Sequence, residues 1–230
     1  MHRVYPLAVR VTVIIPTLNE ERRVGAAIDS AFAAGAEEVI VADGGSSDAT
    51  VTVAREHGAR VIEGETMRSR QMNRAAEAAS HEALLFLHAD TRLPSGACAL
   101  VAEALANGAV FGGFRVQFTE RAFRLRLAAA LINFRTRLTR CPWGDQAQFV
   151  SRKAFVESGA FLEIPIMEDY EIALRMKRRG RTAVLPQKVT TSGRRFLTRG
   201  LVRTSFTNWR IIIAWKLGAD PAQLARMYRA

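Results

Sequence analysis

The stretch LLFLHADTRLP, residues 84–94, places a carboxylate directly behind a run of apolar side chains. Leu84 to Leu87 is typical of a short strand buried on both faces, and Asp90 follows where such a strand would leave the core. The stretch EEVIVAD, residues 37–43, has the same form and ends at Asp43. These two stretches predict buried strands with acids at one edge of a sheet.

Strand and helix patterns alternate through the first half of the chain. Apolar runs at residues 10–16, 37–43, 59–63 and 83–89 predict strands, and the segments between them have helical patterns. Asn19, Ser47 and Ser95 stand where helices would begin and are predicted to cap them. We therefore expect an α/β fold with a Rossmann-like, mostly parallel sheet flanked by helices.

The second half of the chain is less regular. It predicts a strand at residues 109–118, a basic amphipathic helix at 121–140, a short strand at 146–151, a helix at 168–180 and a strand at 182–186. Residues 198–230 read as two C-terminal helices around Gly218 and Pro221.

Composition limits the classes of protein that the chain can belong to. The net charge of +11 favours phosphates, nucleic acid or anionic lipid as partners, and a solvated basic surface is the simpler alternative. Cys98 and Cys141 show no metal-binding spacing and are expected to be reduced. Residues 1–10 lack the apolar core of a signal peptide, and no apolar run approaches the roughly 20 residues that span a bilayer. We expect a cytoplasmic protein, with a peripheral contact at the inner membrane face left open.

Acids and arginines share the predicted edge of the sheet. Asp43 and Asp90 end strands, and Glu168-Asp169 opens a helix. A carboxylate in such a place can accept hydrogen bonds from a nucleoside or bind a hard cation. Arg68, Arg70 and the pair Arg194-Arg195 in SGRRF suit phosphate oxygens. This combination predicts a metal-bound nucleotide diphosphate and not a nucleic-acid groove.

Five segments in a fixed order carry a family resemblance: VTVIIPTLNEE (11–21), VIVADGGSSDAT (39–50), LLFLHADT (84–91), GDQAQFVSRKAF (144–155) and PIMEDYEIALRM (165–176). With these spacings the chain resembles a family-two glycosyltransferase of the GT-A fold. The resemblance runs from about Val11 to about Phe196 and is strongest to a short soluble bacterial subgroup. It implies a single domain over residues 1–230, with a nucleotide-binding half (1–108), an acceptor and catalytic half (109–196) and C-terminal helices (197–230).

The resemblance also implies roles for individual residues. Asp169, with Glu168 beside it, matches the catalytic base, Asp90 matches the metal-binding acid of the D-x-D motif, and Arg194 and Arg195 are expected at the diphosphate. The nucleotide is expected to lie on Pro16, Thr17, Asn19, Glu20, Asp43, Gly45, Arg68, Arg70, Ala89 and Asp90, and the donor sugar and acceptor on Gly144, Asp145 and Gln146.

One motif departs from the family pattern. The first acid of the D-x-D motif is replaced by His88, and no histidine follows it to supply a second metal ligand. The implied cofactor is nevertheless Mg²⁺ or Mn²⁺.

The implied reaction is an inverting transfer of a sugar from a nucleotide-diphosphate donor to an acceptor hydroxyl. UDP is favoured over GDP because of Asp43, and the acceptor is unidentified, with a lipid as one option. Two alternatives stay open: a nucleotidyltransferase acting on sugar phosphates, which would usually have a glycine-rich loop where this chain has PTLNEERR (16–23), and a non-catalytic basic binding protein. No nucleic-acid partner is expected, and a homo-oligomer is left open.

Two apolar and basic segments could contact a membrane or pack in the core. They are the helix at residues 121–140 and the stretch WRIIIAWKLG at 209–218. Because the chain must cover its own sheet, core packing is favoured for both.

Overall fold

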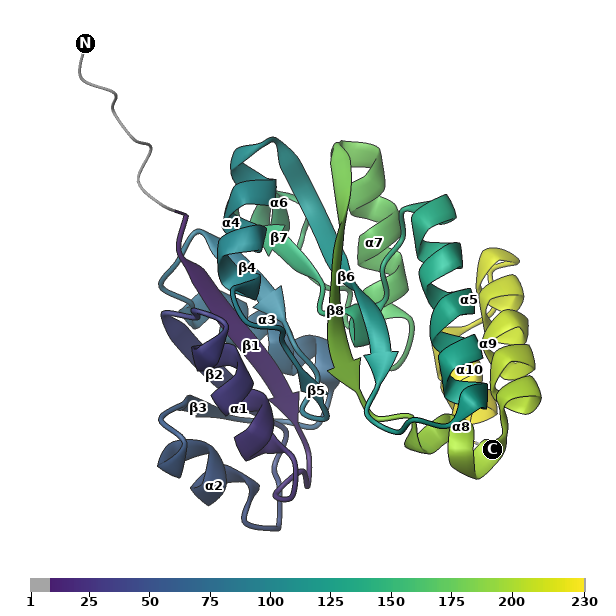
Figure 1. The fold of residues 1–230 in the computed structure, drawn as a ribbon, viewed down its shortest axis with the longest axis horizontal. Helices are drawn as coiled ribbons and strands as arrows, with labels where there is room; N and C mark the ends of the chain where they lie inside the picture. Colours follow the sequence, from purple (N-terminus) through teal and green to yellow (C-terminus); the bar gives the residue numbers. More distant parts are fainter. Residues whose placement is uncertain (1–8, 230) are drawn as a thin grey trace.

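The computed structural model describes residues 9–229, so the residues 1–8 on which much of the signal-peptide expectation depends lie outside the described part. Eight strands form one sheet in the order β3-β2-β1-β4-β7-β6-β8-β5 (Figure 1). The strands are β1 (Val11–Thr17), β2 (Glu38–Asp43), β3 (Arg60–Glu63), β4 (Ala83–Phe86), β5 (Thr91–Arg92), β6 (Ala109–Phe118), β7 (Phe149–Ser151) and β8 (Arg181–Thr191).

Helices flank this sheet and continue beyond it. They are α1 (Val24–Ala33), α2 (Thr50–Glu56), α3 (Arg68–Ala78), α4 (Ala97–Ala106), α5 (Phe123–Thr139), α6 (Arg152–Glu157), α7 (Glu168–Arg179), α8 (Arg194–Arg199), α9 (Leu201–Lys216) and α10 (Pro221–Arg229), with a 3₁₀ turn η1 (Gly144–Gln146). The two helices predicted for residues 198–230 are α9 and α10, which are separated at Gly218 as expected. The short helix α8 before them was not predicted, and β8 is longer than predicted.

The sheet is mixed but mostly parallel, as predicted. β1 pairs in parallel with β2 and β4, β2 with β3, and β6 with β8. The short strand β7 runs antiparallel between β4 and β6, and β5 runs antiparallel to β8. Because β1, β2 and β4 are parallel neighbours, the segments after them leave the sheet at the same edge.

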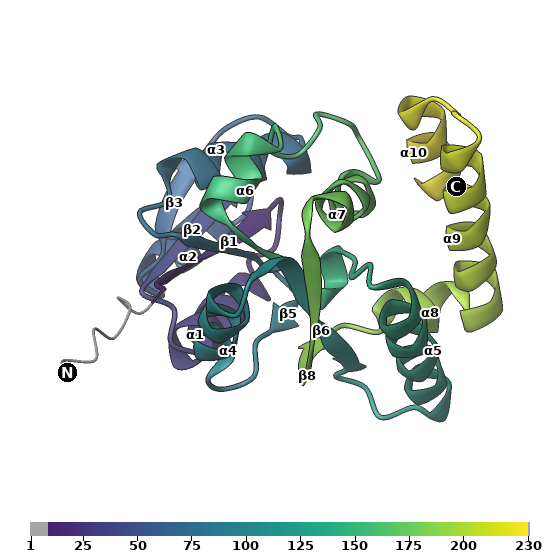
Figure 2. The same ribbon diagram turned by 90° about the horizontal axis from the view of Figure 1, so that it is seen from above.

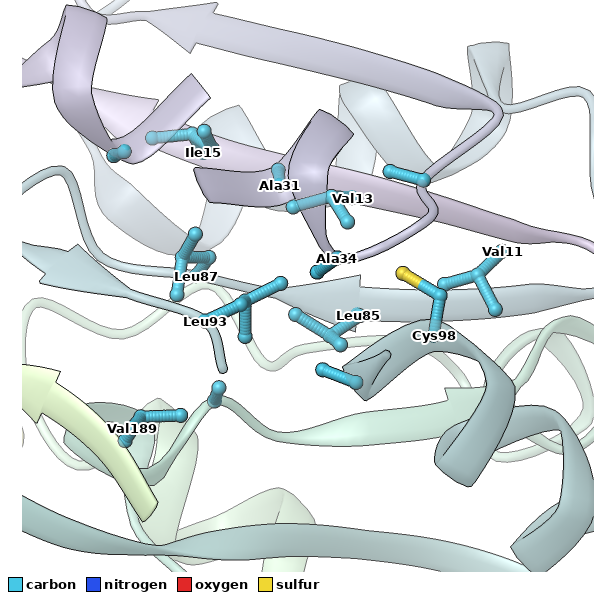
Figure 3. Packing of buried hydrophobic residues seen from close by; sticks show 14 of the residues in the cluster. Val11, Val13, Ile15, Ala31, Ala34, Leu85, Leu87, Leu93, Cys98 and Val189 are labelled. Atoms are coloured by element: carbon cyan, nitrogen blue, oxygen red, sulfur yellow. The ribbon is translucent and has the colours of Figure 1, made fainter. Parts of the chain in front are cut away.

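Both faces of the sheet are buried, which explains the continuous apolar runs of the central strands. Val13 and Ile15 of β1 pack on one face with α1 and α4 (Figure 3). Ile14, between them in sequence, belongs to a second cluster that packs against α3, α6 and α7. Alternate side chains of one strand thus enter two separate apolar layers.

The three predicted helix caps are wrong. Asn19 has a left-handed backbone with φ 55°, and α1 begins five residues later without a side-chain cap. Helix α2 follows Ala49 and not Ser47, and α4 follows Gly96, whose φ of 70° suits a glycine. Asn19 and Ser47 are instead bonded to each other, since the Asn19 Oδ1 accepts from the Ser47 N–H at 2.9 Å.

Candidate active site

The loops after β1 and β2 are joined by hydrogen bonds to the buried carboxylate of Asp43. It accepts from the Thr17 hydroxyl at 3.0 Å and from the N–H groups of Gly45 and Ser46 at 2.9 and 2.8 Å. The Ser46 hydroxyl donates to it as well, at 2.5 Å. Four donors fill the acceptor capacity of a carboxylate, so Asp43 fixes the shape of this loop. Contact between Asp43 and a nucleotide base stays a prediction, and it would require a donor such as the Ser46 hydroxyl to turn away.

The predicted nucleoside loop lies against the same turn. Pro16 and Thr17 are paired with Ala42 and Asp43 in the sheet. The Asn19 N–H donates to the Ser46 hydroxyl at 2.9 Å, and the Glu20 N–H donates to the Thr50 hydroxyl at 2.8 Å. The structure therefore brings Pro16, Thr17, Asn19, Glu20, Asp43 and Gly45 together, whereas their contact with a nucleotide is untested.

Helix α3 connects this loop pair to a second group of polar residues. The buried Gln71 amide donates to the carbonyl oxygens of Thr17 and Ala42 at 2.7 and 2.8 Å. Arg68, one turn earlier, forms a salt bridge with Glu168, whose side chain is 2% exposed at the start of α7. Side chains of α3 thus bond both to the predicted nucleotide-binding loops and to Glu168 of the predicted catalytic pair.

His88 and Asp169 meet at Gly144. The Gly144 N–H donates to Oδ2 of Asp169 at 2.8 Å. A Cβ on Gly144 would lie 2.8 Å from Nε2 of His88 and 3.0 Å from Oδ2 of Asp169, so only glycine fits here without displacement. Burial lowers the pKa of His88 to about 4, and Arg68 adds to this, while Asp90 and Asp169 oppose it. His88 is therefore a neutral imidazole at pH 7.

The carboxylate of Asp145 is poorly stabilised by its surroundings. Its Oδ1 is buried and has no hydrogen-bond partner within residues 9–229. Burial raises the pKa of Asp145 to about 6, with Arg135 opposing the rise and the carboxylates of Asp169 and Asp90 adding to it. Two further carboxylates close enough to disfavour the charge of Asp145 make this a place that favours a cation or a positively charged group.

Gln146 connects the site to α5. Its Oε1 accepts from Arg135 Nη2 at 2.9 Å and from the Thr136 hydroxyl at 2.8 Å, and its amide donates to the Phe114 carbonyl at 2.9 Å. The Arg135 guanidinium lies 3.4 Å from the centroid of the Trp143 ring. Gly144, Asp145 and Gln146 are therefore held beside Asp169 by a buried network.

Sequence reasoning missed Arg135 and Trp143. The buried Nε of Arg135 and the indole N–H of Trp143 have no partner in the described part of the chain, so both have hydrogen-bonding capacity left for a ligand. Arg135 was hidden within a helix whose arginines were interpreted together as a surface. The position of Trp143 directly before Gly144 was the one available signal.

Three predicted arginines have no described contact with the carboxylates of Asp90, Asp145 and Asp169. Arg70 pairs with Glu163 at 2.8 Å and with Glu65 at 2.9 Å on the surface. The Arg195 guanidinium lies 3.5 Å from the centroid of the Tyr228 ring, and burial with help from Arg199 lowers its pKa to about 10. Arg194 and Arg195 line a cavity of about 490 Å³ between α8 and α10. Contact of these arginines with a diphosphate stays a prediction.

The residues fit a cation that is bound jointly by a protein carboxylate and by a diphosphate. No group of three His, Cys, Asp or Glu side chains within residues 9–229 forms a ready metal cage. Asp90, however, follows β4 beside the buried Ala89, and the one hydrogen bond described for its carboxylate is a long one, 3.4 Å from the Thr91 hydroxyl. Mg²⁺ is commonly bound by one or two carboxylates together with substrate phosphates, which is the donor set that Asp90 and a diphosphate would supply.

Several solved structures have a similar arrangement of elements. A mannosyltransferase of Pyrobaculum calidifontis, solved with GDP-Man and Mn²⁺, is 19% identical with a TM-score of 0.66 over 97% of this chain and 69% of that one. Staphylococcus aureus TarS (1–349) is 17% identical with a TM-score of 0.63 over 95% and 70%. Glucosyl-3-phosphoglycerate synthase of Mycobacterium tuberculosis, solved with Mn²⁺ and UDP-Glc, is 22% identical with a TM-score of 0.57 over 78% and 70%. No curated protein matches the sequence closely.

The fold is an α/β fold of the GT-A kind. The family model for glycosyl transferase family 2 matches residues 12–161, which is more than half of the chain, and the chain belongs to this family. It is therefore a nucleotide-sugar-dependent glycosyltransferase. This membership agrees with the family resemblance found in the sequence. It favours a glycosyltransferase over the two alternatives, a nucleotidyltransferase and a non-catalytic binding protein.

Proposed function

We propose that the chain transfers a sugar, with inversion at the anomeric carbon, from a nucleotide-diphosphate donor to an acceptor hydroxyl. The convergence of Asp90, Asp145 and Asp169 beside Arg68 carries this proposal, because sugar transfer needs both a base and stabilisation of a leaving diphosphate. UDP is the favoured nucleotide, and its only support in the chain is Asp43. A cytoplasmic location stays a prediction.

Asp169 is the proposed base. It lies in the first turn of α7, where the positive end of the helix dipole favours an ionised carboxylate. The Gly144 N–H orients its Oδ2, so the same atom can accept the proton of an acceptor hydroxyl above Gly144. The acceptor oxygen forms a bond to the anomeric carbon while the bond from that carbon to the β-phosphate oxygen breaks. The electron pair of the broken bond leaves on the diphosphate, and the proton goes to Asp169.

Charge on the departing diphosphate would be stabilised by neighbouring cations. Arg68 is held near the carboxylates by Glu168 and is the described arginine best placed for this role. A divalent cation held by Asp90 would, when bound, supply Lewis-acid stabilisation of the same leaving group. The neutral His88 adds no competing positive charge at this point.

The test compares binding with turnover in Asp169→Asn. We expect the Kd for UDP, measured by calorimetry with Mn²⁺, to stay within about twofold of wild type, while release of UDP from UDP-sugars falls at least about a hundredfold. Glu56→Gln, an exposed carboxylate change in α2, should leave both unchanged. Near-normal turnover in Asp169→Asn would show that the base is another residue.

A second comparison addresses Asp90. In Asp90→Ala the gain in UDP affinity caused by Mn²⁺ should disappear, because the chain would lose its proposed metal-binding carboxylate. An unchanged Mn²⁺-dependent Kd would contradict the metal assignment without affecting that of the base.

A further inference from the structure

Helix α5 exposes a continuous apolar stripe. Its members are Phe123, Leu127, Leu131, Phe134 and Leu138, which are between 45% and 77% exposed. At 100° per residue these five side chains fall within an arc of about 80° on one side of the helix. On the opposite side of α5, Leu125, Ala128 and Ala129 are buried, and Ala129 joins the core cluster on the sheet, so the core packing expected for this helix is only half right.

Helix α9 repeats the pattern. Val202, Phe206, Trp209, Ile213 and Leu217 are between 48% and 82% exposed and fall within a similar arc of about 80°. Only Thr204 and Ile211 of this helix are buried, so core packing, which was favoured for residues 209–218, is wrong for its apolar stripe. Helices α5 and α9 contact each other and lie side by side at the end of the molecule away from β3 (Figures 1 and 2).

The charges beside both stripes have one sign. Neither α5 nor α9 contains an Asp or Glu. On α5, Arg124 lies on one side of the apolar arc and Arg126 and Arg137 lie on the other, and all three are exposed. On α9, Arg203 and Arg210 lie on one side and Lys216 on the other. An apolar stripe between basic flanks is the pattern of a helix that lies in a membrane interface.

We propose that α5 and α9 together dock the protein on a membrane surface that contains anionic lipids. The apolar side chains would enter the boundary between headgroups and acyl chains, and the flanking guanidinium groups would meet lipid phosphates. Contact is peripheral, because no helix within residues 9–229 is long and apolar enough to cross a bilayer. A second copy fits these helices less well, since a symmetric contact would press two purely basic faces together.

Docking would also orient the active site. Arg135 and Thr136 of α5 hold Gln146 of the site, although their neighbours Phe134 and Leu138 point to solvent. One helix therefore serves both the catalytic network and the proposed docking face. The docking inference depends on the exposed stripes and their charge, and it stands whether or not the proposed sugar-transfer mechanism is right.

Vesicle sedimentation tests the proposal on the full chain. Wild type should sediment with vesicles of phosphatidylcholine mixed with phosphatidylglycerol, should bind phosphatidylcholine alone at least about tenfold more weakly, and should be released as salt is raised. The double variant Phe206→Ser/Trp209→Ser should lose at least about tenfold in partitioning, because two large exposed apolar groups are removed. Arg203→Gln/Lys216→Gln should reduce the preference for anionic vesicles.

Matched controls lie on α6, which is remote from α5 and α9 in both views (Figures 1 and 2). Val156→Ser, at a side chain that is 65% exposed, and Lys153→Gln should leave sedimentation unchanged. Absence of binding to anionic vesicles, or equal losses in the α6 and α9 variants, would overturn the proposal. Light scattering would also overturn the proposal if it showed a wild-type dimer that the variant Phe206→Ser/Trp209→Ser dissociates. A second copy would then cover the apolar stripes.

Discussion

Asp145→Asn should make the protein more stable, and more so as the pH rises. The carboxyl of Asp145 has its pKa raised from an ordinary 3.8 to about 6 by burial, so the folded state resists its ionisation. A group with a raised folded-state pKa contributes stability below its unfolded pKa and loses it as the pH rises through the folded value. The wild-type chain therefore gives up stability between about pH 4 and pH 7 that a neutral asparagine would keep.

The magnitude follows from the two pKa values. One pKa unit corresponds to about 1.36 kcal/mol, so the gap between 3.8 and about 6 corresponds to about 3 kcal/mol above pH 7. At pH 4 the same linkage leaves a gain of only about 0.5 kcal/mol. For a chain of this size, 3 kcal/mol corresponds to a rise in Tm of roughly 6–12 °C.

Urea unfolding of wild type and Asp145→Asn at pH 4 and pH 8 measures this gain directly. Asp48→Asn supplies a control of opposite sign, because its bond from the Thr50 hydroxyl lowers the pKa of Asp48. The Asp48 contribution is present above its ordinary pKa of 3.8 and is lost only as the pH falls below that value, so Asp48→Asn should destabilise the protein at both pH 4 and pH 8. An Asp145→Asn gain that is absent at pH 8, or equal at both pH values, would refute the reasoning.

Two further changes probe the packing of the site. Gly144→Ala should lower sugar transfer by roughly a hundredfold with little change in Tm, because the new Cβ would displace His88 and Asp169 from their positions. Steady-state kinetics that give a kcat near the wild-type value would contradict this geometry. Gln71→Met should lower the free energy of unfolding by about 2–4 kcal/mol, because it removes the donors to the Thr17 and Ala42 carbonyls. An unchanged midpoint in a urea titration would show that these hydrogen bonds contribute nothing.

The sheet and one edge of the site could be predicted because both follow from periodicity. Apolar runs before Asp43 and Asp90, with helical patterns between them, predict buried parallel strands. Both strands pair in parallel with β1, so they end at one edge of the sheet, as predicted. The helix caps could not be predicted in the same way. Asn19 and Ser47 are good capping residues, but a hydrogen bond between their two loops outweighed that local preference.

The side of the site formed by α5 was hidden from the sequence. Its arginines are alike in sequence, yet Arg135 turns toward Trp143 and Gln146 while Arg124 and Arg137 stay exposed. Which side of an amphipathic helix is buried depends on how much sheet remains uncovered. The prediction of core packing holds for one side of α5 and for Ile211, whereas the apolar stripes of α5 and α9 are left at the surface.

A crystal structure of the chain with UDP and Mn²⁺ bound would test the central claim most directly. We expect the metal to be bound by Asp90 and the diphosphate, and the phosphates to lie within reach of Arg68. Asp169 and Gly144 should lie on the side of the diphosphate where the donor sugar would be attached. Density for the nucleotide and metal at any place remote from these carboxylates would contradict the assignment of the active site.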